Sequence, residues 1–254
     1  MSTRSQKLHA SPYSKLALIY DDIMSHVDYR RWAQYISAII ERYNKETNTI
    51  LDIACGTGSL LLELYREKYQ LIGFDFSFDM VKKAREKRIT SNDLFFYQGD
   101  MRFFSLNLKV DAALCLYDSI NYLTEFDQWK LMFDCVWRVL SSGGLFIFDI
   151  CTEKNSIKYF SQYIESNAGE NYDYKRESSY DKRKNVHINK FAINFDHEYE
   201  QIIESHVQRI YLLNEVEKLI AESKFHCLGI FDGFSFRRGS ENSLRVHYVL
   251  QKVV

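Results

Sequence analysis

The stretch that most constrains this chain is Ile50-Leu51-Asp52-Ile53-Ala54-Cys55-Gly56-Thr57-Gly58, which a leucine-rich run follows directly. The order is an apolar run with an acid near its end, then a glycine pair, then helix-forming residues. This order is typical of a buried strand, a tight turn and a helix N-terminus. At such a turn a ligand can approach bare backbone, because glycine carries no Cβ. The stretch therefore predicts a nucleotide-type site.

Two features separate this turn from a dinucleotide site. A dinucleotide fingerprint needs a third glycine three residues after the second, and Leu61 stands there. Asp52 would also repel a pyrophosphate, whereas a ligand with an amino group and a sulfonium would find that carboxylate favourable. S-adenosylmethionine (SAM) is such a ligand.

The run from Leu51 to Gly58 resembles the first motif of the class I SAM-dependent methyltransferases, and further motifs follow in the family's order between about Tyr13 and Gln251. The closest resemblance is to small bacterial methyltransferases with an inserted antiparallel lid sheet, similar in look to amino-sugar N-methyltransferases. It implies an enzyme with SAM as cofactor and S-adenosylhomocysteine as product. The first-motif residues implied to bind the cofactor are Asp52, Ala54, Gly56 and Gly58.

A second buried strand ends at Asp75. In nucleotide folds an acid at this place accepts hydrogen bonds from ribose hydroxyls, and its two oxygens suit a diol. The alternative is a loop acid that caps the next helix, but Ser77 is the better N-cap. Phe76 and Met80 are then placed to wall the adenine.

The third and fourth strands complete the predicted cofactor site. By resemblance, Asp100 after the third strand accepts from the adenine amino group, and the Met101 amide faces a ring nitrogen. The fourth strand ends at Leu116, which we include among the cofactor-binding residues. Ligands bind outside the carboxyl ends of parallel strands, so the loop over residues 117–122 should face both cofactor and substrate.

The run from Tyr13 to Trp32 carries apolar and aromatic residues at helical spacing, and core packing is the default interpretation for most of them. The run also resembles the N-terminal segment of the small bacterial enzymes, in which tyrosines help to close the SAM pocket. On this resemblance we assign Tyr20 to the cofactor site, with Tyr13 and Trp32 as further candidates.

From about residue 172 the pattern changes to turn-separated β-rich segments, which we interpret as an antiparallel lid sheet inserted into the core. The predicted strands cover residues 176–180, 186–195 and 199–211, after a helical or irregular connector from residue 151 to 170. The apolar residues change parity within the middle strand, which predicts a bulge near Lys190.

The last predicted lid strand places Glu200, Glu204, His206 and Gln208 on one face. That face either is solvated, the default for a half-buried antiparallel strand and the interpretation we favour, or lines a substrate cleft. If the methyl acceptor must lose a proton, the candidate bases are Asp118 and His206, with Tyr117 as a third. Each has a structural alternative: Asp118 as a loop cap, Tyr117 as packing, His206 as a structural histidine.

These elements predict an α/β, doubly wound, Rossmann-like sheet of seven strands, the last one antiparallel, with a small antiparallel lid sheet. A chain of 254 residues, 46% of them apolar, can bury one such core. We expect a disordered tail over residues 1–12, a core over 13–150 and 212–254, and the connector and lid over 151–211.

Bulk properties limit the partners. The formal net charge of -1 leaves no electrostatic footprint for nucleic acid, and no apolar run approaches the roughly 20 residues that span a bilayer. Five cysteines without CxxC spacing suggest neither a metal site nor disulfides, so we expect a cytoplasmic protein. A covering lid favours a small-molecule acceptor.

We therefore predict a methyltransferase that transfers the sulfonium methyl to a nucleophile by in-line displacement. Two other classes stay open. A nicotinamide oxidoreductase would share the fold pattern, although Leu61 and Asp52 count against it. A catalytically silent SAM-binding module is the second, because every strong motif reports cofactor binding and none reports turnover. The acceptor atom and the oligomeric state are not encoded in any motif of the chain.

Overall fold

The computed structural model describes residues 6–66, 69–87 and 93–253. Its core is a seven-stranded sheet in the order β11-β12-β6-β5-β2-β3-β4. The strands are β2 (Thr49–Ile53), β3 (Gln70–Asp75), β4 (Leu94–Gln98), β5 (Val110–Cys115), β6 (Leu140–Cys151), β11 (Phe225–Asp232) and β12 (Arg245–Lys252). Neighbouring strands from β6 to β4 are parallel, whereas β12 pairs antiparallel with both β6 and β11. The predicted fold class is confirmed.

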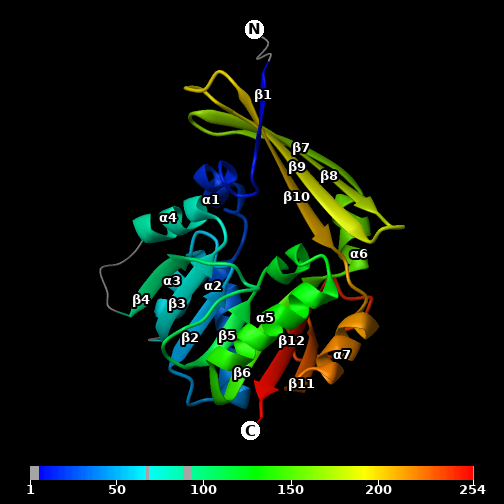
Figure 1. The fold of residues 1–254 in the computed structure, drawn as a ribbon. Coiled ribbons are helices and arrows are strands. Elements are labelled where there is room, and N and C mark those ends of the chain that lie inside the picture. The colour runs from blue at the N-terminus through cyan, green and yellow to red at the C-terminus, as the bar shows by residue number, and fades with distance from the viewer. Residues whose placement is uncertain (1–5, 67–68, 88–92, 254) are drawn as a thin grey trace.

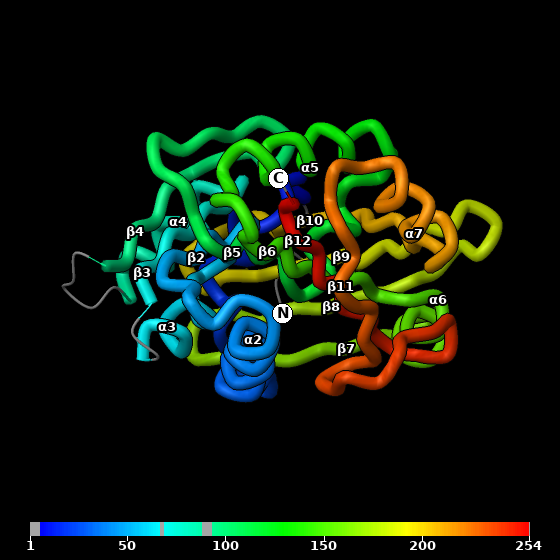
Figure 2. Tube along the Cα trace, turned by 90° about the horizontal axis from the view of Figure 1, so that it is seen from below, coloured from blue at the N-terminus to red at the C-terminus, as the bar shows by residue number. Residues whose placement is uncertain are grey.

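Helices cover both faces of this sheet, with α2 and α5 on opposite sides (Figure 2). They are α2 (Tyr29–Tyr43), α3 (Ser59–Tyr65), α4 (Phe78–Glu86), α5 (Phe126–Val139) and α7 (Leu213–Glu222). One buried cluster joins α2, α3 and α4 to the sheet through Ile36, Leu61 and Val81, and another joins α5 and α7 through Trp129 and Val216. No helix among the described residues is long and apolar enough to cross a membrane.

A second sheet stands over the carboxyl ends of the parallel core strands (Figure 1). Its order is β1-β10-β9-β8-β7. The strands are β1 (Lys7–Ala10), β7 (Gln162–Ala168), β8 (Tyr172–Asp181), β9 (Val186–Phe195) and β10 (Gln201–Arg209). β1 runs parallel to β10, and the other neighbours are antiparallel. We call these five strands the lid sheet.

Short helical turns lie between the core sheet and the lid sheet. They are the 3-10 turns Leu16–Leu18 and Ser119–Tyr122, α1 (Tyr20–Ile23), α6 (Glu153–Asn155) and the single π turn Ser156–Phe160. The segment from residue 16 to residue 23 packs its apolar side chains under the apolar half of the lid sheet. The N-terminal part of the chain is thereby held between the lid sheet and the core.

The lid sheet differs from the predictions at three places. Lys7–Ala10 is a strand, so the tail over residues 1–12 is not disordered where the structure describes it; residues 1–5 lie outside the described residues. Gln162–Ala168, expected as connector, is also a strand, and its polar, exposed sequence carried no strand signal. The register of β9 is continuous on both sides, so the bulge prediction at Lys190 is wrong.

The missing bulge has a simple cause. Along β9 the odd-numbered residues face inward throughout, including the buried His187 and Asn189 as well as Phe191. In the first half of β9 the inward residues are polar, and the outward residues Val186 and Ile188 are apolar. The sequence pattern therefore places the apolar face on the wrong side of that half and predicts a bulge to reconcile the two halves. Polar residues point inward here because a cavity lies beneath them.

Candidate active site between the core and the lid

A cavity of about 600 Å³ lies between the carboxyl ends of the core strands and the lid sheet. Its wall is formed by the glycine turn after β2, the segment from Tyr13 to Trp32, the loop after β5, the segment over residues 151–160, the inward faces of β7 to β10, and Arg245 of β12. The predicted cofactor residues in this wall are Tyr20, Asp52, Ala54, Gly56 and Leu116. Tyr13, Trp32 and all three candidate bases also line it.

The glycine turn opens onto the cavity at Gly56. Ala54, Gly56 and Gly58 have φ angles of 61°, 56° and 75°, the left-handed region that favours glycine. A Cβ added to Gly56 would meet nothing within 4 Å, so the backbone there is bare and reachable. At Gly58 an added Cβ would lie 2.8 Å from Cζ of Phe96, so this glycine permits close packing rather than ligand access.

Asp52 is a buried carboxylate that faces the cavity. Its side chain is 3% exposed and accepts no hydrogen bond from any described residue. Burial raises the pKa of Asp52 to about 8, with a further contribution from the nearby Asp75. A buried carboxylate without a partner is costly, and a cationic group beside it would lower that cost.

Asp75 braces the glycine turn. Its two carboxylate oxygens accept from the Gly56 and Ser77 amides, both at 2.9 Å. Burial raises the pKa of Asp75 to about 6, although these backbone hydrogen bonds oppose the rise. The predicted N-cap is confirmed, since Ser77 Oγ accepts from the Met80 amide at 3.2 Å. Ser77 Oγ also donates to the carbonyl of Tyr13 at 2.7 Å, so the N-terminal segment crosses directly above.

Glu204 on β10 holds that segment in place from the lid side. Its carboxylate accepts from the backbone amides of Tyr13, Lys15 and Leu16 at 2.7, 2.6 and 2.9 Å. Glu204 is 0% exposed, and burial alone would raise its pKa. The neighbouring imidazole of His206 and the hydrogen bonds from the amides of Leu16 and Lys15 nevertheless lower the pKa of Glu204 below its ordinary value.

A second anchor ties the same segment to the glycine turn. Asp21 of α1 accepts from Thr57 Oγ1 at 2.6 Å and forms an ion pair with Lys87 Nζ at 2.6 Å. Lys87 also donates to Thr57 Oγ1 and to Ser59 Oγ, each at 2.9 Å. The cover over the cavity is therefore fixed to the turn on one side and to β10 on the other.

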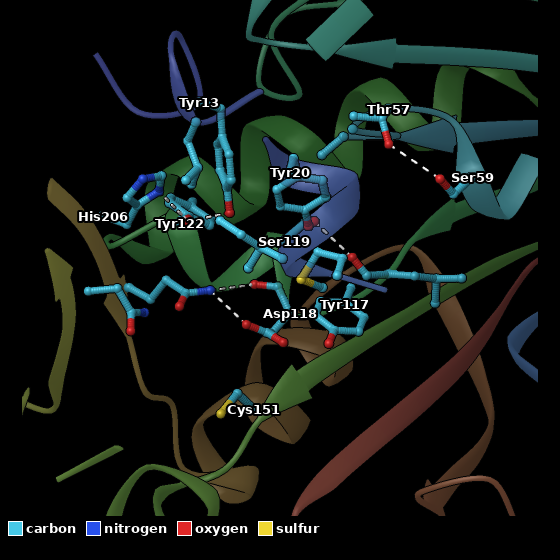
Figure 3. Close-up of a pocket in the computed structure, with 18 of the residues that line it drawn as sticks. Tyr13, Tyr20, Thr57, Ser59, Tyr117, Asp118, Ser119, Tyr122, Cys151 and His206 are labelled. Atoms are coloured by element: carbon cyan, nitrogen blue, oxygen red, sulfur yellow. Dashed lines mark hydrogen bonds between the residues drawn. The ribbon is translucent and has the colours of Figure 1, made fainter. Parts of the chain in front are cut away.

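Three ring side chains meet at the top of the cavity (Figure 3). The hydroxyls of Tyr13 and Tyr122 are 2.7 Å apart, and the Tyr122 hydroxyl is 3.0 Å from Nδ1 of His206. Nε2 of His206 lies 3.4 Å from the Glu204 carboxylate. Burial raises the pKa of both tyrosines well above 10, so their hydroxyls keep their protons at neutral pH. The four side chains form a continuous polar path from a buried carboxylate to the cavity.

The inward face of β10 is buried, and the solvent interpretation of that face is wrong. Glu204 is 0%, His206 1% and Gln208 6% exposed. Outward residues such as Val207 are the exposed ones on this strand. The default for a half-buried strand failed because a second layer, the N-terminal segment and the loop after β5, covers the polar face.

Asp118 and Tyr117 belong to a charged cluster at the floor of the cavity. Asp118 accepts from Arg245 Nη2 at 2.6 Å and from Gln208 Nε2 at 2.8 Å. Arg245 also donates to Asp149, which is fully buried at the end of β6. The guanidinium of Arg245 lies over the Tyr117 ring, 4.9 Å from its centroid. Both oxygens of Asp118 are therefore held by donors.

Comparisons with known proteins agree on one family. Residues 50–144 match the model of a methyltransferase domain. The Bacillus subtilis protein YqeM, named as a methyltransferase, is 28% identical over 243 residues, which is 94% of this chain and 97% of that protein. A crystal structure of a SAM-dependent methyltransferase from Clostridium acetobutylicum has a TM-score of 0.81 at 26% identity and covers 95% of this chain and 99% of that one. This chain is a class I SAM-dependent methyltransferase.

A further relative of this methyltransferase has a stated small-molecule substrate. The dTDP-3-amino-3,6-dideoxy-alpha-D-glucopyranose N,N-dimethyltransferase of Streptomyces fradiae is 35% identical over 96 residues. The match covers 38% of this chain and 36% of that enzyme, so the chain spans little more than a third of the relative's length.

Six of the residues predicted to bind the cofactor do not line the cavity of the methyltransferase. They are Gly58, Asp75, Phe76, Met80, Asp100 and Met101. Phe76 is 66% exposed, and Met80 is a buried residue of α4. The Asp100 carboxylate accepts hydrogen bonds from the Arg102 side chain, and Oδ2 of Asp100 lies 2.5 Å from Nη2 of Arg102. These hydrogen bonds lower the pKa of Asp100. Their assignment to the cofactor remains a prediction.

The sequence reasoning missed several polar residues of the methyltransferase cavity. Asp149 does not line the cavity but accepts from Arg245, which does; it ends an apolar run as Asp52 and Asp75 do, and that repeated pattern could have revealed it. Arg245, Arg176 and His187 stand alone in their strands, and no local pattern marks them. No group of three or more metal-ligating side chains occurs in the part of the chain that the structure describes.

Proposed function

We propose that this methyltransferase transfers the methyl group of SAM to a small molecule enclosed beneath the lid sheet. The observation that carries the proposal is the unpaired, buried carboxylate of Asp52 in a cavity whose opposite wall is the polar inward face of β10. The ammonium end of SAM suits Asp52, and the bare backbone at Gly56 leaves room for its amino-acid part. When bound, SAM supplies an electrophilic methyl on a sulfonium.

The side chains of this enzyme contribute mainly by alignment. Asp52 and the glycine turn would hold one reactant, and the lid face the other, with water excluded by the N-terminal segment. Well-oriented intramolecular reactions reach effective molarities on the order of 10^5 M, so alignment alone supplies a large share of the rate. The amino-sugar relative supports a small-molecule acceptor, and we propose that this enzyme works in the cytoplasm, where its five free cysteines stay reduced.

His206 is the candidate that we favour for moving a proton. It lines the cavity, it is hydrogen-bonded to Tyr122, and Glu204 stands behind it. A carboxylate behind an imidazole stabilises the protonated ring, which is what a general base needs when it takes a proton from the acceptor. Asp118 is held by Arg245 and Gln208, and we propose that it shapes the floor of the cavity.

Calorimetric titration tests the cofactor assignment. SAM and S-adenosylhomocysteine should bind, NADH should not, and Asp75→Ala should weaken binding because it removes the brace of the glycine turn. Tight NADH binding without a SAM signal would instead support an oxidoreductase.

Transfer of label from methyl-labelled SAM into a low-molecular-weight cell extract tests turnover. His206→Ala should lower the rate and leave SAM affinity nearly unchanged, whereas Lys7→Ala on the outer part of the lid sheet should change neither. SAM binding by the wild type without any transfer of label would leave a silent binding module, and an unchanged rate in His206→Ala would return His206 to a structural role.

A further inference from the structure

Arg176 places an unpaired positive charge in the cavity. It lies on the inward face of β8, and its Nε and Nη2 donate to Oδ1 of Asn189 at 3.1 and 2.8 Å. Ser178 Oγ donates to the same oxygen at 2.6 Å, so Asn189 is fixed in its orientation. The guanidinium carbon lies 5.0 Å from the ring centroid of Phe160 and 5.8 Å from that of Tyr163. The side chain is thus oriented by Asn189 and shielded by aromatic rings.

No carboxylate among the described residues forms an ion pair with Arg176. Glu165 is its direct partner in the β7–β8 register, but the Glu165 oxygens accept from the hydroxyls of Tyr174 at 2.8 Å and Tyr163 at 3.2 Å. Nη1 of Arg176 donates to no described residue. Since Asn189 takes the Nε side, the free Nη1–Nη2 edge offers the parallel donors that bind a carboxylate or phosphate in a bidentate manner.

His187 supplies a second, independent sign of a ligand. The side chain is 3% exposed and lines the same cavity from β9. Its Nδ1 is 3.4 Å from Ser156 Oγ, whereas its Nε2 has no hydrogen-bond partner in the structure. Buried polar atoms without a partner are uncommon, and one in the wall of a cavity indicates that a ligand binds there. Burial lowers the pKa of His187 to about 4, so the ring is neutral at pH 7.

The strand register places these groups beside the proposed reaction site. β8, β9 and β10 are adjacent, and Asn189 lies directly opposite His206 across the β9–β10 pair. The β8 residue in that row is Ser178, two positions from Arg176. With strands roughly 5 Å apart and about 3.3 Å per residue, the backbone positions of Arg176 and His206 are about 12 Å apart. A small molecule can span from the guanidinium to the Tyr13–Tyr122–His206 group.

We propose that Arg176 and His187 form a subsite for an anionic group of the methyl acceptor, a carboxylate or a phosphate, set apart from the atom that is methylated. This inference rests on the proposed function, because it needs the cavity to hold an acceptor. It narrows the substrate class to anionic small molecules with a planar or apolar portion that fits against Phe160 and Tyr163. Arg176 and His187 are then specificity-determining residues for the acceptor.

Benzoate and phenyl phosphate are suitable probes, because each joins an aromatic ring to one of the two candidate anions. Each is titrated into protein saturated with S-adenosylhomocysteine, with benzyl alcohol as the neutral comparison, and the dissociation constants are measured by ligand-observed NMR. We expect Arg176→Gln to weaken the tighter probe about tenfold or more, since it removes a charged bidentate contact. His187→Gln should weaken it less. The preferred probe distinguishes carboxylate from phosphate.

Arg66→Gln is the matched control, because Arg66 is exposed and paired with Glu63 on α3. Failure of both probes to bind the wild type, or equal affinities in Arg176→Gln and Arg66→Gln, would overturn the subsite while leaving the proposed function intact. A loss of S-adenosylhomocysteine affinity in Arg176→Gln would assign Arg176 to the cofactor and also overturn it. Failure of the wild type to bind S-adenosylhomocysteine would refute the proposed function itself.

Discussion

Glu204→Ala should release the N-terminal segment while leaving the core folded. The substitution removes the acceptor of three backbone amides, those of Tyr13, Lys15 and Leu16, which lie 2.6 to 2.9 Å from a fully buried carboxylate. Tyr13 has a φ of 61°, a conformation that costs energy for a residue with a Cβ and persists only while its surroundings enforce it.

The magnitude follows from the geometry. Hydrogen bonds to a charged group contribute about 1.5–3 kcal/mol each, but the three here are lost together and the freed amides regain water. We therefore expect the local opening free energy to fall by about 3 kcal/mol, the lower end of what breaking a buried charged interaction costs. Since 1.4 kcal/mol is tenfold, amide exchange in this segment should accelerate on the order of 100-fold.

Hydrogen–deuterium exchange with mass spectrometry measures this effect in peptides that contain residues 13–16. Glu198→Ala is the matched control, since Glu198 also reaches the segment, through an ion pair with Lys15 Nζ at 3.0 Å, but accepts from none of the three amides. An exposed ion pair contributes at most about 1 kcal/mol, so the control should change exchange by less than about sixfold. Equal protection in Glu204→Ala and Glu198→Ala would refute the anchoring role.

The pH dependence has a definite sign. The pKa of Glu204 is lower in the folded protein than its ordinary value of about 4.3. The stabilisation that Glu204 gives to the N-terminal segment is therefore fully present at any pH above about 4.3. It is lost as the pH falls through the lower folded-state pKa. Protection of residues 13–16 in the wild type should therefore be constant from pH 7 to pH 5 and decline in more acid solution.

Three further predictions concern the core. Burial raises the pKa of Asp52 to about 8, so stability should fall as the pH rises from about 4 to 8 and level off above 8, and SAM affinity should rise as the pH approaches 8; Asp52→Asn should abolish both trends in denaturation and calorimetry. Gly58→Ala and Gly143→Ala both place a side chain at positive φ, but only at Gly58 does the Cβ clash, so urea unfolding should show an additional loss of about 1–3 kcal/mol there. Arg245→Met leaves Asp149 buried and unpaired and should cost about 3–5 kcal/mol in the same assay, and a second substitution, Asp149→Asn, should recover part of the loss.

Local patterns predicted the core because each element carried its own signal. The glycine turn, the acid at the end of β3 and the cap at Ser77 are short-range features, and the structure places all of them as the sequence indicates. The doubly wound topology then follows from alternating strands and helices. The glycine turn and its supporting cap were therefore predictable, whereas the ribose and adenine assignments stay predictions, because those residues do not line the cavity.

The lid half was not predictable for the opposite reason. Glu204, His206 and His187 look like solvated residues of half-buried strands, because nothing in their neighbourhood along the chain reveals the layer that covers them. The partners of Glu204 lie about 190 residues away, at separations of 191, 189 and 188 positions. Only the folded arrangement shows that these polar residues face a cavity.

The pairing of β1 with β10 also sets an order of events during synthesis. The amide of Tyr13 leaves the ribosome 191 residues ahead of the carboxylate that will hold it. At translation rates of roughly 5–20 residues per second, the N-terminal segment waits about 10–40 s for that carboxylate to emerge. The first strands of the core can pair during this interval, so the cover over the cofactor turn is made before those strands and is among the last parts to close.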